Sequence, residues 1–188
     1  MDDAVVDRVD PRVARTKRDV ITAGASLLLE DGWSAMTHAA VARLAGYSKA
    51  TVYAHWPTTL DLMRDVCEQI CEVTENTAPP ATGNLRDDLH SCLSRFSHTL
   101  TQGRFDLLLA GVVERGGRDE VVRDLGNRLY EAGTSGLRRI LDSHLGPADA
   151  TLTLTLLVGA VVARATYEGK AISDAFITDI INRVLPAD

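Results

Sequence analysis

The residues with the clearest chemical potential lie in one short stretch, Thr37 to Trp56, which runs THAAVARLAGYSKATVYAHW. Lys49 can hold a phosphate or a guanine edge, and Thr51 offers a hydroxyl and a methyl group that can contact thymine. Tyr53 and His55 can reach phosphate oxygens. Side chains of these types, so close together, predict a surface that contacts nucleic acid.

Two short helices are expected to position these side chains. Thr37 and Ser48 can each accept a backbone N–H bond as an N-cap, which predicts helices over 37–45 and 48–55. Gly46 follows the first helix, where a left-handed backbone costs a residue with a Cβ about 1 kcal/mol. Two short helices joined by a tight glycine turn are typical of a helix-turn-helix.

The two sides of this helix-turn-helix are predicted to have different roles. Val52 and Trp56 point toward the core as anchors, while Ala50 leaves room for the close approach of DNA. In the first short helix, Val41, Leu44 and Ala45 are expected on the inner face.

The roles of three residues in this stretch stay open. Tyr53 suits either a phosphate contact or half-buried packing, and Tyr47 in the turn suits packing as well as a backbone contact. His38 is a candidate DNA contact from the first turn of its helix, although a solvated position on the helix surface suits it better.

Charge is distributed unevenly along the chain. The net charge is -6, yet residues 11–56 carry six Lys and Arg, including Lys17, against three Asp and Glu. The excess of acidic residues lies outside this segment. A locally basic segment joined to an acidic body can attract phosphates although the whole chain is acidic.

Helical periodicity extends over the remainder of the chain. A helix is predicted from Pro11 to the Asp31-Gly32 stop, and residues 1–10 are predicted to be a mobile acidic tail. Residues 151–155 alternate as a strand would, but their apolar run is too long for a strand, so a helix is predicted. The further helices are expected at 59–76, 85–101, 105–114, 118–145, 149–168 and 173–185. The predicted fold class is therefore all-α, with a three-helix helix-turn-helix head and a body of about six helices.

Other kinds of chemistry find little support in the sequence. Cys67 and Cys71 share a helical face, which suits a thiol sensor or a metal pair, but two small buried residues are the expected interpretation. No catalytic motif, cofactor motif or metal-ligand spacing stands out, so neither an enzyme nor a metal site is predicted. The longest uncharged apolar run, 150–163, is shorter than the roughly 20 residues of a membrane span, and few cysteines suit a reducing compartment. A soluble, cytoplasmic protein is expected.

Over about residues 13–66, which include the predicted helix-turn-helix, the chain resembles the TetR family of transcriptional regulators. One position departs from the family pattern: Thr59 stands where the family usually has a Lys that contacts a DNA phosphate. The residues that carry the resemblance are Lys17 to Gly32, Thr37, Val41-Ala42, Ala45-Gly46 and Ser48 to Trp56.

The resemblance implies a DNA-binding domain at 11–57 and a ligand-binding and dimerisation domain at 58–188. It also implies a homodimer that binds a palindromic double-stranded operator, most often as a repressor, and that is released by a small-molecule effector of unknown identity. The alternative is a helical ligand-binding or enzymatic protein with a vestigial head. The predicted DNA-binding residues are Lys17, Thr37, His38, Ser48, Lys49, Ala50, Thr51, Tyr53, His55 and Thr59. The apolar run in the second-last helix suits core or interface, and the resemblance favours an interface made by Leu156, Gly159, Ala160, Ala163, Phe176, Ile177, Ile180 and Ile181.

Overall fold

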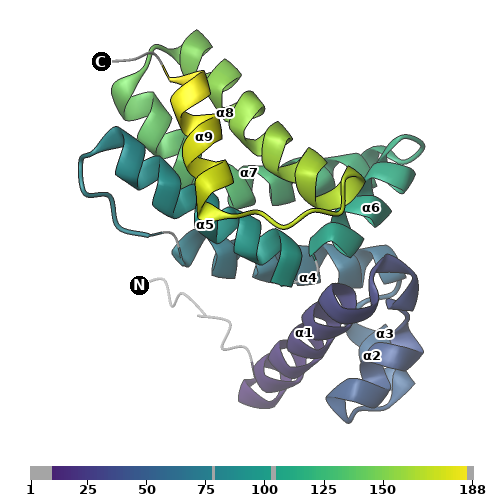
Figure 1. The fold of residues 1–188 in the computed structure, drawn as a ribbon. Coiled ribbons are helices and arrows are strands. Elements are labelled where there is room, and N and C mark those ends of the chain that lie inside the picture. Colours follow the sequence, from purple (N-terminus) through teal and green to yellow (C-terminus); the bar gives the residue numbers. More distant parts are fainter. Residues whose placement is uncertain (1–9, 78, 103–104, 186–188) are drawn as a thin grey trace, which may run out of the picture. The chain divides into compact units, whose positions relative to one another are not determined.

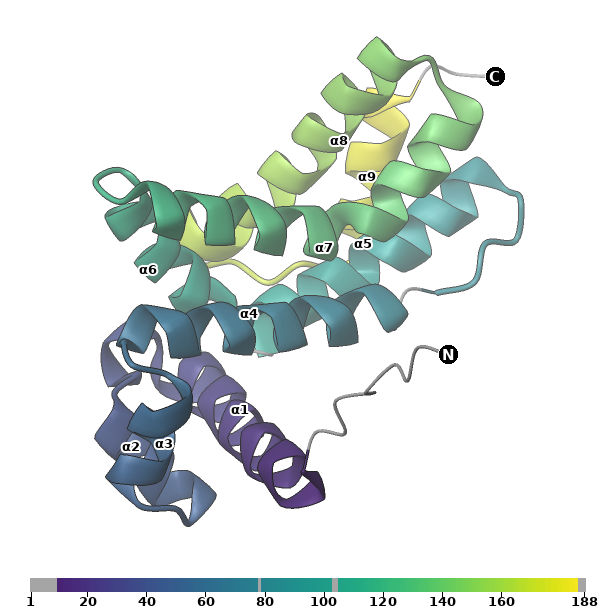
Figure 2. The same ribbon diagram turned by 180° about the vertical axis from the view of Figure 1, so that it is seen from behind.

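The computed structural model describes residues 10–77, 79–102 and 105–185, whose regular structure is entirely helical (Figures 1 and 2). The predicted all-α class is confirmed. The elements in chain order are α1 (Pro11–Asp31), a 3-10 turn η1 (Trp33–Ala35), α2 (His38–Ala45), α3 (Lys49–His55), α4 (Thr59–Asn76), α5 (Leu85–Gln102), α6 (Phe105–Gly116), α7 (Glu120–His144), α8 (Pro147–Val162), a π-helical turn η2 (Ala163–Tyr167) and α9 (Asp174–Val184).

The chain divides into two compact units, a head that ends at Gln69 and a body that begins at Ile70. The sequence-based boundary lay before α4, whereas the structure divides the chain within this helix. The first turns of α4 belong to the head because they pack on α1: a Cβ added at Gly24 would lie only 2.6 Å from Cγ2 of Val66.

Local capping explains where the helices of the head begin and end. Asp10 was expected in the mobile tail, but its carboxylate accepts the N–H of Arg12 at 2.8 Å and caps α1. The remainder of the predicted tail lies outside the described residues. The hydroxyl of Thr37 accepts the N–H of Ala40 at 3.2 Å, and Gly46 ends α2 in the left-handed region at φ 76°. Both features were predicted.

The core of the head confirms the two anchors of α3 and corrects one residue of α2. Val52 and Trp56 are buried, as expected. Leu44 was expected on the inner face, but 56% of it is exposed. The inner arc of α2 is occupied by His38, Val41 and Ala42, and position 44 falls outside this arc at 100° per residue.

The body is built around α7, which packs against α5, α6 and α8, while α9 packs against α5 and α8. Both views show these helices layered on one another (Figures 1 and 2). Aliphatic side chains dominate its core, as the low aromatic content requires. Members of this core include Leu89, Leu93, Leu137, Leu141, Leu154, Leu157, Val161, Ile177 and Ile181.

The segment Pro147–Tyr167 is long and apolar enough to cross a membrane by length and composition alone, with a mean hydropathy of 1.5. Its inner face instead packs in the body core through Leu154, Leu157 and Val161. Only 33% of the most apolar 18-residue stretch of this segment is buried within one chain. Much of this apolar helix is therefore available for contacts beyond the single chain.

None of the three cysteines forms a disulfide, and all three are buried, which agrees with the interpretation of Cys67 and Cys71 as small packing residues. Burial raises the pKa of the Cys92 thiol. Among the described residues, no group of three or more His, Cys, Asp and Glu side chains is arranged to hold a metal ion.

Candidate functional site

Half of the side chains that were expected to contact DNA lie on α3. Lys49 and Ala50 are exposed, and 48% of Tyr53 is exposed. Thr51 and His55 are half-buried. A lysine, an alanine and a tyrosine thus project from a seven-residue helix, in a form that could enter a DNA groove.

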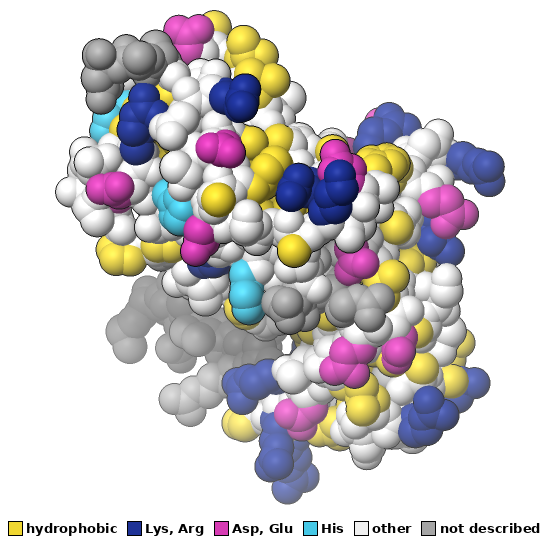
Figure 3. Space-filling view, in the orientation of Figure 1, with side chains coloured by type: hydrophobic (Ala, Val, Ile, Leu, Met, Phe, Trp, Pro, Cys, Tyr) yellow, Lys and Arg dark blue, Asp and Glu magenta, His cyan; other side chains and the backbone are white. Residues whose placement is uncertain are grey.

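Positive charge on α1 and α2 extends this surface. Several Lys and Arg side chains project from the head in Figure 3. Arg15 forms an exposed ion pair with Asp19 at 3.8 Å, a distance at which the pair contributes little to stability. The exposed basic residues in the described part of the head outside α3 are Arg12, Arg15, Lys17, Arg18, Arg43 and Arg64.

The hydroxyls of Thr37 and Ser48 are used to begin the two helices. Ser48 Oγ accepts the N–H of Thr51 at 3.0 Å and lies 2.8 Å from the Thr51 hydroxyl. Because one lone pair of each cap hydroxyl already accepts a backbone N–H, a DNA contact by Thr37 or Ser48 would have to use the second lone pair or the neighbouring backbone. The structure gives them a positioning role within the head.

His38 is not on the helix surface, where the sequence suggested it would lie. Only 4% of it is exposed, and its Nε2 lies 2.7 Å from the carbonyl oxygen of Trp56. Its ring stacks on Tyr53 with centroids 4.0 Å apart and an angle of 11°. Its Nδ1 lies 3.4 Å from the hydroxyl of Thr59 at the start of α4. The expected position of His38 on the helix surface is wrong: the ring is buried against α3 and supports Tyr53.

Replacing His38 by Ala is expected to lower the free energy of unfolding by about 2 kcal/mol, because it leaves the buried Trp56 carbonyl without a partner and removes the ring beneath Tyr53. Chemical denaturation followed by circular dichroism measures this loss. His98→Ala, at an exposed histidine of the body, is the matched control and should leave stability unchanged. Equal stability of the two variants would contradict the structural role of His38.

Two further polar contacts hold the head together and were not found from the sequence. The Tyr47 hydroxyl donates to Asp19 Oδ2 at 2.8 Å, which ties the turn of the helix-turn-helix to α1. The Trp56 indole N–H donates to Asp65 Oδ2 at 2.8 Å and ties the end of α3 to α4. The partners lie 28 and 9 positions apart, and no local pattern pairs them.

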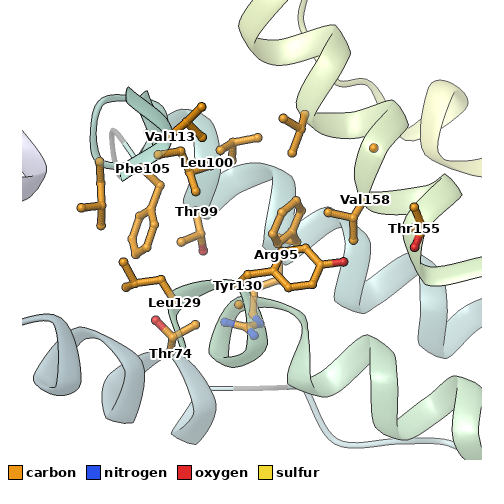
Figure 4. A pocket seen from close by; sticks show the side chains of 16 residues that line it. Thr74, Arg95, Thr99, Leu100, Phe105, Val113, Leu129, Tyr130, Thr155 and Val158 are labelled. Atoms are coloured by element: carbon orange, nitrogen blue, oxygen red, sulfur yellow. The ribbon is translucent and has the colours of Figure 1, made fainter. Parts of the chain in front are cut away.

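The body contains a cavity of about 350 Å³, for which the sequence named no residues. Figure 4 shows its side chains, which come from α4, α5, α6, α7 and α8. A volume of this size lies at the lower end of the range for small-molecule sites. The lining residues are Thr74, Arg95, Phe96, Thr99, Leu100, Phe105, Leu108, Leu109, Val113, Leu129, Tyr130, Gly133, Thr155, Val158, Gly159 and Val162.

The cavity wall is almost entirely apolar, and Arg95 is the one charged residue among the described residues that line it. One guanidinium nitrogen of Arg95 donates to the Thr77 hydroxyl at 3.1 Å, whereas its Nε is buried without a hydrogen-bond partner. The Thr74 hydroxyl donates back to the Ile70 carbonyl at 2.7 Å. This arrangement can enclose an apolar molecule.

The residues expected at a dimer interface differ in how far the single chain buries them. Ile177 and Ile181 are 1% and 2% exposed within their own chain, so the structure places them in the protomer core and not at its surface. They point inward because they follow the inner stripe of α9 at a spacing of four. Gly159 borders the cavity. The other predicted residues are exposed or half-buried: Leu156, Ala160, Ala163, Phe176 and Ile180.

Two family models match the chain and together span both units. Residues 79–184 match the model described as "Tetracyclin repressor-like, C-terminal domain". Residues 20–66 match the model described as "Bacterial regulatory proteins, tetR family".

The chain is also similar to curated proteins over nearly its whole length or over the head alone. It is 22% identical to the HTH-type transcriptional regulator YdeS of Bacillus subtilis over 178 residues, which cover 91% of this chain and 88% of the relative. It is 46% identical over 63 residues to the HTH-type regulator Rv1556 of Mycobacterium tuberculosis, covering 34% of this chain and 30% of the relative.

Solved structures share the fold. The flavonoid-responsive regulator FrrA has a TM-score of 0.67 at 24% identity, covering 91% of this chain and 93% of its own. The multidrug-binding protein EbrR, complexed with ethidium, has a TM-score of 0.73 at 18% identity, covering 94% of this chain and 100% of its own. With a helix-turn-helix head, an all-helical body and family models matched across both, the chain belongs to the TetR family of DNA-binding transcriptional regulators.

Proposed function

We propose that this regulator is a repressor that binds a palindromic operator as a homodimer and leaves it when a small molecule occupies the body cavity. One observation carries the proposal: a capped helix-turn-helix with an exposed Lys49–Tyr53 surface and an apolar cavity belong to separate compact units of the same chain. Because such a regulator acts where the chromosome is, the proposed location is the cytoplasm.

In the proposed complex, α3 enters the major groove. Lys49 holds a phosphate or a guanine edge, Ala50 permits close approach, and Tyr53 contacts a phosphate while its ring stays on His38. Thr51 and His55 are half-buried, which leaves them fewer exposed atoms for DNA than Lys49. Lys17 and the caps Thr37 and Ser48 are proposed to contact the DNA backbone.

Thr59 takes the place where the family usually has a lysine. Its hydroxyl lies 3.4 Å from His38 Nδ1, so it is near the network that supports α3. The residue remains exposed and can offer a phosphate a neutral hydrogen bond in place of an ion pair. We propose that Lys49 and the basic residues of α1 supply most of the phosphate attraction.

The dimer is proposed to form through the outer faces of α8 and α9. Leu152 and Leu156 are 59% and 48% exposed, four positions apart on α8. They border one hollow with Val184 of α9. A two-fold axis through this surface would pair it with itself and present two α3 helices to half-sites about 34–36 Å apart or slightly more.

The effector is proposed to bind in the cavity of the body. FrrA is described as flavonoid-responsive, and EbrR as a multidrug-binding protein complexed with ethidium. Thr74 of α4 lines the cavity, and the same helix begins in the head, so ligand contact with its end provides a covalent route between the units. A change from mostly bound to mostly free requires the ligand to favour one conformer by about 5 kcal/mol.

Selection of bound DNA from a random pool tests the proposal, which predicts a palindrome with a fixed half-site spacing. On the selected DNA, Lys49→Ala should weaken binding and flatten the dependence of log K on log salt by about one unit for each phosphate that the variant no longer binds. Fluorescence anisotropy at several salt concentrations measures both effects.

Arg118→Ala, which removes an exposed charge from the body, is the control and should leave the salt slope unchanged. An unchanged slope for Lys49→Ala would remove this residue from the phosphate contacts. Selection of no preferred sequence would contradict the proposed function itself.

A further inference from the structure

We propose that the effector is a flat apolar molecule that carries a carboxylate or another oxyanion, and that Arg95 binds this charged group. The inference depends on the proposed function, because it assigns a chemical class to the ligand of the same cavity.

The first support is the incomplete hydrogen bonding of Arg95. Its Nε is buried and has no hydrogen-bond partner, while a terminal nitrogen donates to the Thr77 hydroxyl. A buried donor without an acceptor is destabilising, more so when it belongs to a charged group. An acceptor that reaches Nε would therefore complete the hydrogen bonding of this guanidinium.

The second support is the charge of the cavity. Among the residues that the structure describes, no Asp or Glu lines the cavity and no carboxylate forms an ion pair with Arg95. Arg95 is half-buried, so solvent screens its charge only in part, and it attracts an anion and repels a cation. Nε and a terminal nitrogen form a planar fork that matches two oxygens of a carboxylate.

The third support is the shape and chemistry of the walls. Phe96, Phe105 and Tyr130 contribute aromatic rings, and aliphatic side chains supply most of the remaining surface (Figure 4). Aromatic walls favour flat ring systems through stacking and edge contacts. A ligand with one anionic end and an aromatic body satisfies both the walls and Arg95.

The inference separates this regulator from a relative of the same fold. Ethidium, which occupies the EbrR structure, is a cation, and an Arg in the wall would oppose such a ligand. We therefore expect the two proteins to favour opposite charges.

The test uses three probes of nearly equal shape: naphthalene-2-carboxylate, the neutral naphthalene-2-carboxamide and the cationic 2-naphthylmethylammonium. Isothermal titration calorimetry with the full-length protein measures their affinities. The carboxylate should bind about tenfold more tightly than the carboxamide, and the ammonium most weakly.

Two variants assign the preference to Arg95. Arg95→Met keeps the apolar length of the side chain and should reduce carboxylate affinity to that of the carboxamide. Arg95→Lys keeps the charge and should retain part of the preference. Arg118→Met is the matched control, and circular dichroism confirms that each variant is folded.

The proposal is overturned if the carboxamide or the ammonium binds the unaltered protein as tightly as the carboxylate, or if no carboxylate binding occurs up to its solubility limit. Equal carboxylate affinity in Arg95→Met overturns it as well. Operator binding is measured on the same preparations. If Arg95-dependent carboxylate binding leaves operator affinity unchanged, the ligand class stands and the effector role fails. If a neutral or cationic compound releases the operator, the repressor stands and this inference fails.

Discussion

Leu156→Asp is expected to convert the dimer to monomers and to lower operator affinity by roughly 100-fold or more, because an unpaired charge at a closed interface costs about 3–5 kcal/mol. The side chain is 48% exposed in one chain, so the change leaves the protomer core intact. Because the proposed interface is two-fold symmetric, it contains the substituted residue of both protomers. A monomer would bind half-sites independently and without the gain that a linked second site provides.

Sedimentation velocity measures the oligomeric state, and anisotropy measures operator affinity. Val121→Asp is the matched control, since Val121 is also exposed, at 37%, but lies at the start of α7. It should leave both the dimer and operator binding unchanged. A dimer that persists in Leu156→Asp would exclude this face of α8 from the interface.

Thr99→Phe is expected to weaken ligand binding in the body by roughly 100-fold while operator affinity stays within about twofold, because the added ring occupies the cavity. N-phenyl-1-naphthylamine, a neutral dye whose fluorescence rises in apolar sites, provides the measurement without reference to Arg95. In the unaltered protein the dye should bind in the cavity. In the variant its fluorescence gain should be nearly absent.

The control for this substitution comes from the same helix. Thr101 lies two residues further along α5, is exposed and does not line the cavity. Thr101→Phe should bind the dye as the unaltered protein does, because its new ring points elsewhere. Full dye binding by Thr99→Phe would show that the dye binds outside the cavity. Loss of operator binding in that variant alone would show that the cavity and the head are coupled through packing as well as through the ligand.

Features set by neighbours in the chain were predictable. The caps at Thr37 and Ser48 and the left-handed Gly46 each depend on hydrogen bonds or backbone angles within three or four residues. The spacing of apolar residues indicated α1 and the longer helices of the body, because each must bury one stripe, whereas the 3-10 turn η1 was not predicted. The buried anchors Val52 and Trp56 followed from the same periodicity.

Features set by distant partners were not predictable in the same way. His38 is a polar residue in the first turn of a helix, and only the approach of α3 and the Trp56 carbonyl makes its position buried. Asp19 and Asp65 likewise acquire their roles from Tyr47 and Trp56. Ile177 and Ile180 both belong to an apolar stripe, and the position of α5 and α8 decides which of them is covered.

The sequence alone therefore determined the helix-turn-helix, its exposed chemistry around Lys49 and the all-helical class, since these depend on short-range capping, turns and periodicity. The tertiary structure alone decided that His38 supports α3, that α4 is divided between head and body, and that Arg95 lies in an apolar wall. A cavity is formed by side chains from five helices, and no local pattern encodes which of their faces meet.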